Sequence, residues 1–388
     1  MLKPFKHQQR LIDENPKVRL LAHEGGTGKT ICACLWLKLD NRDDDALVIC
    51  PKKVVKKWKK SLEDWNTKAT VVNMDSEFKT LAHKKWSAII VDEVDHFGSP
   101  LFIKGTSARA KHLYGLIKLN IYTDRLLLSA TPVRSTPYNF HNILCYLGIY
   151  IDWKKWREQF FELRIPFWGK YATWLVKDNW QKDIQPYIKR YSDIVLLSEC
   201  VDELPPLIEE EIHIKMPKWI PTQDNDKFSD EHMYEQSKKL EHILEAGRKY
   251  RKVLVVAFYR EHTEKLYEEL SKDKKTFMIR GGVKNQEDII KQAQDIDDCY
   301  FVVQASIGDG FDLDTFSCAV FTSMSYAVRD FVQMKFRMRR IHNLHPVKHY
   351  YLLAGRCDRA VFNAIKAGRD FVPSETFDSW EINNNNNK

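Results

Sequence analysis

Short apolar runs alternate with segments of helical periodicity along the first 150 residues of the chain. The apolar runs, each long enough for one buried strand, are residues 18–22, 46–50, 71–73, 88–91 and 125–129. The helical segments that separate them include residues 30–39, 54–65 and 137–147. Alternation of this kind predicts a parallel sheet with helices on its faces.

A second alternating block extends from residue 208 to residue 371. Its expected strands and helices are residues 253–258, 261–270, 277–280, 300–304, 319–322, 350–353 and 358–367. Because 388 residues exceed what one core holds, we expect two α/β domains, at 1–150 and 208–371.

The segment between the two blocks differs from them in composition and in its pattern of apolar residues. Residues 151–207 are rich in Trp, Lys and Arg without clear strand alternation, so we expect a helical insert and linker there. Five of the eleven tryptophans, with lysines and arginines between them, could stack on nucleic-acid bases, but packing of the insert on its parent domain is the favoured interpretation. The asparagine-rich tail, 372–388, is expected to be disordered.

Composition narrows the class of protein only moderately. A net charge of +8 favours a polyanionic partner, although it is also compatible with simple solubility. No window of about 18 apolar residues exists, so we expect no membrane contact. Because the N-terminus also lacks a signal-peptide core, we expect a protein that is not secreted and stays in the cytoplasm of a prokaryotic or phage-infected cell. The eight cysteines include no Cys-x-x-Cys pair and are expected to be buried free thiols, not zinc ligands or disulfides.

A glycine-rich segment, residues 23–30, joins the first apolar run to the first helical segment. Such a turn points successive backbone N–H groups at an anion, and the following helix adds the positive end of its dipole. In this pattern Lys29 reaches the β and γ phosphates and Thr30 holds Mg²⁺, although His23 stands where the first glycine of the pattern is usual. The residues expected to bind the nucleotide here are Gly26, Thr27, Gly28, Lys29 and Thr30.

Two carboxylates follow the apolar run that ends at Val91. A pair of acidic residues at the end of a buried strand, beside a phosphate-binding turn, predicts a metal–nucleotide site. Asp92 would hold Mg²⁺ through water, and Glu93 would orient and deprotonate the attacking water. The alternative is a solvated acidic loop.

Three later segments add to the candidate motifs along the chain. They are Ser129-Ala130-Thr131, the glycine loop 306–313 and the arginine-bearing segment 333–341, for which we expect a helix. Read in order, the segments resemble the motifs of superfamily 2 helicases and translocases, with the closest likeness to the Swi/Snf-like branch and to compact phage-type DNA helicases. The resemblance covers nearly the whole chain and implies two RecA-like domains with ATP hydrolysed at their interface.

The resemblance also implies roles for single residues. Gln8 corresponds to the adenine contact, and Ser129 and Thr131 correspond to the segment that couples hydrolysis to nucleic acid. The implied catalytic residues, besides Glu93, are Gln333, Arg337 and Arg340, and the implied nucleotide contacts of the glycine loop are Gly310 and Asp312. Arg337 and Arg340, three residues apart, are expected to share one helix face and to stabilise the charge of the transition state.

The basic segment from Pro51 to Lys60 is a further candidate contact for nucleic acid. Its apolar residues fall at helical spacing, which predicts an amphipathic helix and argues against a nuclear-localisation signal. Lys52 and Lys53 lie where the resembled family contacts the phosphate backbone.

The sequence therefore predicts an ATP-dependent and Mg²⁺-dependent DNA helicase or translocase, a nucleic-acid-stimulated ATPase that moves on or remodels duplex or branched DNA. Two other functions stay open. One is an RNA helicase, because the motifs do not separate the two substrates. The other is a nucleic-acid clamp that uses ATP only as a ligand, against which Glu93 and Arg340 argue. Protein partners cannot be predicted from the sequence.

Overall fold

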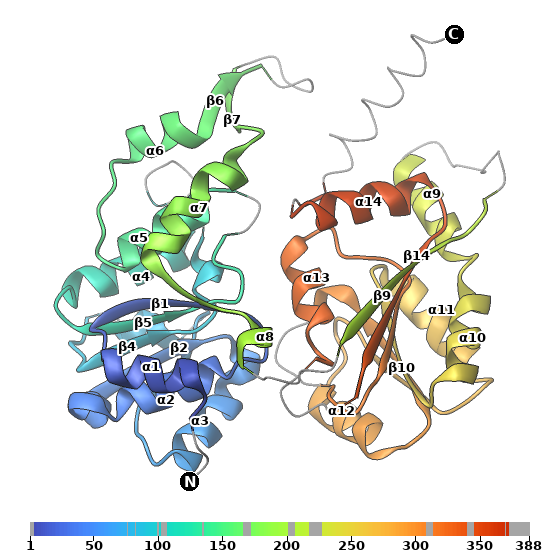
Figure 1. Ribbon diagram of the computed structural model, residues 1–388, viewed down its shortest axis with the longest axis horizontal. Helices are drawn as coiled ribbons and strands as arrows, with labels where there is room; N and C mark the ends of the chain where they lie inside the picture. The colour runs from blue at the N-terminus through green and yellow to red at the C-terminus, as the bar shows by residue number, and fades with distance from the viewer. Residues whose placement is uncertain are drawn as a thin grey trace. The chain divides into compact units, whose positions relative to one another are not determined.

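The chain forms two compact units, Met1–Asp202 and Glu203–Lys388, which are described separately (Figure 1). The computed structural model describes residues 4–75, 77–81, 83–98, 101, 107–133, 136–165, 172–200, 206–216, 227–307, 313–339, 345–368 and 370–371. The expected disordered tail therefore lies outside the described residues. Among the helices within these ranges, none has the length and apolar character needed to cross a membrane.

The first unit is built on a six-stranded parallel sheet with the order β3-β2-β4-β5-β1-β8. Its strands are β1 (Val18–His23), β2 (Ala46–Cys50), β3 (Thr70–Asn73), β4 (Ala88–Val91), β5 (Asp124–Leu128) and β8 (Ser192–Val195). The central strands are almost wholly buried, which accounts for their continuous apolar sequence. Five of the six strands were predicted from the apolar runs.

Helices cover both faces of this sheet (Figure 1). They are α1 (Lys6–Glu14), α2 (Lys29–Leu37), α3 (Val55–Asp64), α4 (Ala108–Leu119), α5 (Tyr138–Tyr146), α6 (Trp153–Phe160), α7 (Trp180–Tyr191) and the short α8 (Leu197–Cys200), with 3₁₀ turns η1 (Leu39–Asp45), η2 (Lys52–Val54), η3 (Glu77–Leu81) and η4 (Val94–Phe97). Leu21 and its face of the sheet pack on α1, α2 and α3, whereas Leu20 and the opposite face pack on α4, α5, α6 and α7. Successive residues of a strand therefore pack their side chains into two different hydrophobic cores, one on each face of the sheet.

The segment from 151 to 200 contains strands that the sequence pattern did not indicate. β6 (Phe161–Arg164) and β7 (Thr173–Val176) pair antiparallel, and β8 pairs with β1 at the edge of the main sheet. Trp156 and Trp180 are buried in the same core as α4 and α5, so the packing interpretation is confirmed for these two rings. Trp174 is 36% exposed and lies under the Arg157 guanidinium, 4.2 Å from its ring centre.

The second unit repeats the design with the strand order β11-β12-β10-β13-β14-β9, again all parallel. Its strands are β9 (Leu207–His213), β10 (Lys252–Ala257), β11 (Thr276–Ile279), β12 (Cys299–Gln304), β13 (Cys318–Phe321) and β14 (Val347–Leu353). Its helices are α9 (Lys227–Gln236), α10 (Leu240–Lys249), α11 (Arg260–Leu270), α12 (Gln286–Asp295), α13 (Val328–Lys335) and α14 (Arg356–Lys366), with the 3₁₀ turn η5 (Ala305–Ile307). Two RecA-like α/β units with parallel sheets flanked by helices are the predicted fold class, which is confirmed.

A buried polar network joins α9 to the start of α14 in the second unit. The Lys239 ammonium is fully buried, donates to Gln236 Oε1 at 3.0 Å and pairs with Asp358 Oδ2 at 2.6 Å. Asp358 Oδ1 also lies 3.0 Å from His232 Nε2, and Oδ2 accepts from the Ala354 amide at 2.9 Å. Although burial alone would raise it, the pKa of Asp358 falls below its usual range because Lys239 and His232 stabilise the carboxylate.

Candidate functional site

The candidate site of the first unit lies at the carboxyl ends of β1, β4 and β5. β5 lies between the other two strands in the sheet, so the segments that follow all three emerge at the same edge. In open parallel sheets this edge is where ligands bind. The glycine turn follows β1, the two carboxylates follow β4, and Ser129 follows β5.

The turn after β1 has the backbone that an anion-binding loop requires. Gly26 and Gly28 have φ values of 89° and 83°, and Gly28 is the residue before the first turn of α2. Only glycine adopts this conformation without strain. A Cβ atom at position 28 would also lie 2.9 Å from the Gln8 amide nitrogen, so the Gln8 side chain would have to shift.

Lys29 folds back onto the same turn. Its ammonium donates to the backbone carbonyls of His23 at 2.8 Å and Glu24 at 3.3 Å. Thr27 is buried and its hydroxyl donates to the Glu24 carbonyl at 2.9 Å. The cation is therefore held over the turn by neutral carbonyl oxygens, which a phosphate oxygen can replace with a stronger, charge-assisted bond. Thr30 follows directly, in the first turn of α2.

Gln8 lies beside the turn with half of its amide unpaired. The side chain is 2% exposed, and its carbonyl oxygen accepts from the Phe5 amide at 3.0 Å. Its amide nitrogen has no hydrogen-bond partner in the described parts of the chain. A buried donor without a partner destabilises the folded state by about 1–3 kcal/mol. A hydrogen-bond acceptor on a bound ligand would remove this cost.

The segment after β4 holds Asp92 by two hydrogen bonds and gives Glu93 an unusual backbone geometry. Asp92 Oδ2 accepts a hydrogen bond of 2.8 Å from the Trp58 indole, and Oδ1 accepts from the Glu93 amide at 3.0 Å. Glu93 has φ 49° and ψ 52°, a left-handed conformation that side chains other than glycine and asparagine rarely adopt. Such strain of about 1–3 kcal/mol persists where the surroundings impose it, often at functional sites.

The electrostatics of Asp92 depend on its burial and on Lys29. Burial raises the pKa of the Asp92 carboxyl, whereas the Trp58 hydrogen bond and the nearby Lys29 charge oppose that shift. A cation at this carboxylate would favour the charged form further.

Ser129 connects the segment after β5 to the segment after β4. Its hydroxyl donates to Asp95 Oδ1 at 2.9 Å and accepts from the Thr131 amide at 3.1 Å, and both Ser129 and Asp95 are fully buried. The two loops therefore share one hydrogen-bonded chain, so a shift of either loop is transmitted to the other.

Comparisons with known proteins add little to this geometry. No protein-family model matches the chain, and no curated protein matches its sequence. Among solved structures, it is similar to the Sulfolobus solfataricus SWI2/SNF2 ATPase core in complex with dsDNA, at 14% identity, over 98% of this chain and 94% of that chain, with a TM-score of 0.43. A likeness this distant supports no argument, so the fold and the site rest on the geometry above.

Lys52 and Lys53 are exposed in η2, directly before α3. The predicted amphipathic helix is confirmed: α3 buries Trp58 and Leu62 in the core and leaves its lysines outside. Because Trp58 also bonds Asp92, α3 connects the exposed lysines to the carboxylates.

The arginine-bearing segment of the second unit differs from its prediction. α13 ends at Lys335, and Phe336 has φ −92° and ψ 4°, so residues 336–339 are not helical and the expected shared helix face of Arg337 and Arg340 is wrong. Arg337 instead lies in the turn that follows, 9% exposed, and its carbonyl accepts from the Leu313 amide at 2.9 Å. Gln333 lies on α13, and its buried amide oxygen has no partner in the described residues. Gly310, Asp312 and Arg340 lie outside the described residues.

Sequence reasoning missed several residues that shape the site. Trp58 and Asp95 were assigned no role in the site. His7, His23 and Asp193 were given no role, although they surround the base of the glycine turn. No sequence signal identifies them, because hydrogen bonds from Trp58 and His23 join residues 34 and 170 positions apart.

Proposed function

We propose that the chain is a nucleic-acid-stimulated ATPase, a compact phage-type translocase of the Swi/Snf-like branch of superfamily 2, which moves on or remodels DNA. The observation that carries the proposal is the single sheet edge at which a glycine turn with a cation follows β1, a half-buried aspartate and a strained glutamate follow β4, and Ser129 follows β5. Each of these features also occurs in proteins that bind no nucleotide, but their convergence fits ATP hydrolysis.

In this proposal Lys29 exchanges its bonds to the His23 and Glu24 carbonyls for oxygens of the β and γ phosphates. The amide groups of Gly26, Thr27 and Gly28 surround the same phosphates. The buried amide nitrogen of Gln8 donates a hydrogen bond to a ring nitrogen of adenine, so that this amide nitrogen gains the partner it lacks among the described residues.

Thr30 and Asp92 are the residues that fit Mg²⁺, because a hydroxyl and a carboxylate are the hard oxygen ligands that the ion prefers. Mg²⁺ would supply charge neutralisation at the phosphates. Trp58 fixes the orientation of Asp92 by its hydrogen bond, and Glu93 orients a water molecule and accepts its proton.

The residues proposed to act from the second unit are Gln333, Arg337 and Arg340, with Gly310 and Asp312 as nucleotide contacts. A guanidinium stabilises the negative charge that spreads over a transferred phosphoryl group. Lys52 and Lys53, both exposed, are the proposed contacts to the nucleic-acid backbone, and DNA is preferred to RNA.

The test is ATP turnover of the purified chain with no nucleic acid, duplex DNA, single-stranded DNA, forked DNA and RNA. We expect stimulation by DNA, and we expect Lys29→Ala to abolish turnover and to weaken ATP binding about 10- to 100-fold, because a bond to a charged group is lost. Lys38→Ala, at the other end of α2, is the matched control and should leave turnover unchanged.

Each other outcome has a definite meaning. Selective stimulation by RNA would favour an RNA helicase. Binding of ATP without turnover on any nucleic acid would favour the clamp, and unchanged turnover in Lys29→Ala would contradict the proposed nucleotide site.

Ser129→Ala removes the hydrogen bond to Asp95 without removing a proposed nucleotide contact. We expect turnover without DNA to stay within a few-fold of the unchanged chain, whereas the stimulation by DNA falls about tenfold, the equivalent of one net hydrogen bond of about 1.4 kcal/mol. The measurement is the ratio of turnover with and without duplex DNA. An unchanged ratio would show that the bond is structural only.

A further inference from the structure

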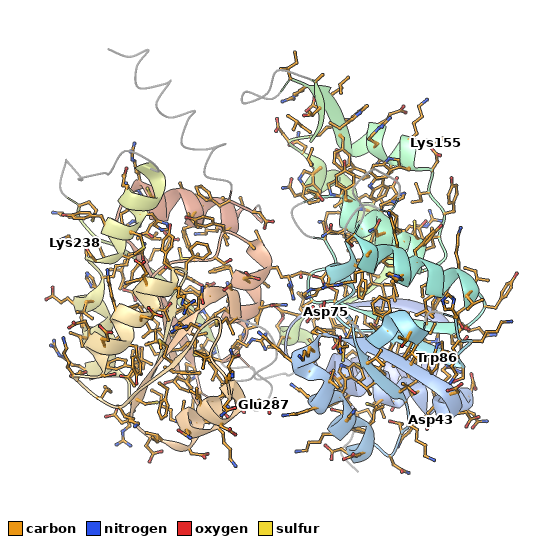
Figure 2. The ribbon with its side chains drawn as sticks, turned by 180° about the vertical axis from the view of Figure 1, so that it is seen from behind. Asp43, Asp75, Trp86, Lys155, Lys238 and Glu287 are labelled. Carbon is orange, nitrogen blue, oxygen red and sulfur yellow. The ribbon has the colours of Figure 1, made fainter. Side chains whose placement is uncertain are left out.

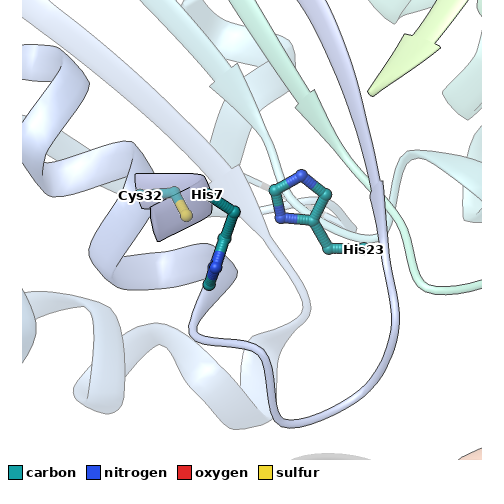
Figure 3. Close-up of side chains that lie close together, drawn as sticks. All are labelled: His7, His23 and Cys32. Carbon is teal, nitrogen blue, oxygen red and sulfur yellow. The ribbon is translucent and has the colours of Figure 1, made fainter. Parts of the chain in front are cut away.

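His7, His23 and Cys32 come together beneath the glycine turn from three separate segments (Figure 3). His7 lies on α1, His23 is the last residue of β1, and Cys32 lies in the first turn of α2. One ligand atom from each of the three lies within 4.8 Å of the other two, and all three residues are buried. A fourth residue, Cys200 on α8, has its sulfur 3.5 Å from His7 Nδ1.

The hydrogen bonds of the two histidines fix which nitrogen of each ring carries the proton. His7 Nε2 lies 3.0 Å from the Thr27 carbonyl, and His23 Nε2 lies 3.1 Å from the Asp193 carboxylate. Both partners only accept, so each Nε2 donates and each Nδ1 keeps a lone pair. His23 Nδ1 has no partner within the described residues, although the ring is fully buried.

This arrangement is the one that metal-binding histidines use. A ligating imidazole donates its second N–H to a carbonyl or carboxylate, which fixes the ring and makes the ligating nitrogen more basic. Burial lowers the pKa of both His7 and His23, so the rings stay neutral at neutral pH. Neutral imidazoles and cysteine thiolates form the donor set typical of Zn²⁺.

We propose that His7, His23, Cys32 and Cys200 form a tetrahedral site for a thiophilic transition metal ion, and that Zn²⁺ is the ion that best fits the donors. Binding displaces the proton of each thiol into solvent, and the two thiolates balance the charge of the ion. Ligand atoms around zinc are separated by about 3.5 Å, so movements of about 1 Å would bring His7, His23 and Cys32 to that spacing, and Cys200 already lies 3.5 Å from His7 Nδ1.

The position of the site connects it to the glycine turn. His7 holds the Thr27 carbonyl, and the His23 carbonyl accepts from Lys29. The positive charges of Lys29 and Arg10 act against a cation here, whereas Asp193, which also pairs with Arg10, offsets them. A bound ion would restrict the backbone of residues 24–28 whether or not the chain hydrolyses ATP.

The test uses the full chain, freed of metal with a chelator and kept without nucleotide or Mg²⁺, and titrated with Co²⁺ as the probe. We expect one equivalent to bind with the visible bands of tetrahedral cobalt and the near-ultraviolet band of thiolate coordination, and Zn²⁺ to displace it. Cys200→Ser, at the partly exposed position, should remove about half of the thiolate band, and Cys32→Ser should weaken binding at least tenfold.

The matched control is Cys145→Ser. Cys145 is also buried beside a histidine, with its sulfur 4.0 Å from His141 Nδ1, but it lies outside the cluster, so its removal should leave the spectrum unchanged. Asp193→Asn keeps the ligands but weakens the acceptor of His23, and should lower the affinity about 10- to 100-fold. Slower amide exchange of residues 24–28 on addition of Zn²⁺ would report the connection to the turn.

Absence of a thiolate band in the unchanged chain would overturn the proposal, as would equal losses in Cys145→Ser and Cys32→Ser. Because none of these readouts involves ATP, failure of the metal site and failure of the ATPase proposal are distinguishable.

Discussion

Glu93→Gln is expected to bind ATP as the unchanged chain does and to lose about 10²- to 10⁴-fold in turnover. The amide has the size of the carboxyl group but cannot accept a proton, and general-base catalysis contributes a factor of this order. The backbone at this position is already left-handed, and the substitution does not alter it. ATP binding by equilibrium dialysis and turnover under saturating DNA are the two measurements.

An acidic residue in the exposed turn after β3, Asp75, provides the control. Asp75→Asn makes the same chemical change at a carboxyl that pairs with Arg109 and is about half exposed, so turnover should not change. Equal losses in the two variants would assign the effect to net charge, and full turnover in Glu93→Gln would remove Glu93 from the catalytic step.

Lys239→Met is expected to destabilise the second unit by about 3–5 kcal/mol. Methionine replaces the buried aliphatic stem but leaves the Asp358 carboxylate without its cationic partner, and removal of one member of a buried pair has a cost of this size. Urea denaturation, followed by amide exchange in β10 and β13, measures the change.

Lys238→Met is the matched control, because Lys238 is exposed and points away from the core (Figure 2). It should change the stability by less than about 0.5 kcal/mol. The double variant Lys239→Met with Asp358→Asn should recover part of the loss, since no unpaired carboxylate remains. Equal stability of Lys239→Met and the unchanged chain would mean that water or another cation reaches Asp358.

The sheet cores were predictable because their strands are buried on both faces. Val253–Ala257 and Ala88–Val91 are apolar throughout, which is the pattern expected of central parallel strands. β8 and β9 were missed for the opposite reason. β9 reads Leu-Ile-Glu-Glu-Glu-Ile-His and lies at a sheet edge with most of its side chains exposed, so its apolar content is low.

The candidate site was predictable where it depends on local backbone chemistry. The glycines, Lys29 and the two carboxylates follow their strands directly, so their order in the sequence places them at one edge of the sheet. The end of α13 was not predictable from periodicity, because the arginines continue the helical spacing beyond Lys335 while the backbone turns to let the Arg337 carbonyl accept from Leu313. Long-range contacts such as Trp58 with Asp92 leave no local pattern.

The hydrogen bond from Trp58 to Asp92 connects α3 to the candidate site. A helix of ten residues moves as a rigid rod, and this one has the exposed lysine turn at one end and the Trp58 indole one turn into its length. A pull on the lysines along the rod would draw the indole with it and reorient the Asp92 carboxyl. Under the proposed function, tension on a nucleic-acid strand bound at Lys52 and Lys53 would reach the Asp92 carboxylate through the Trp58 side chain.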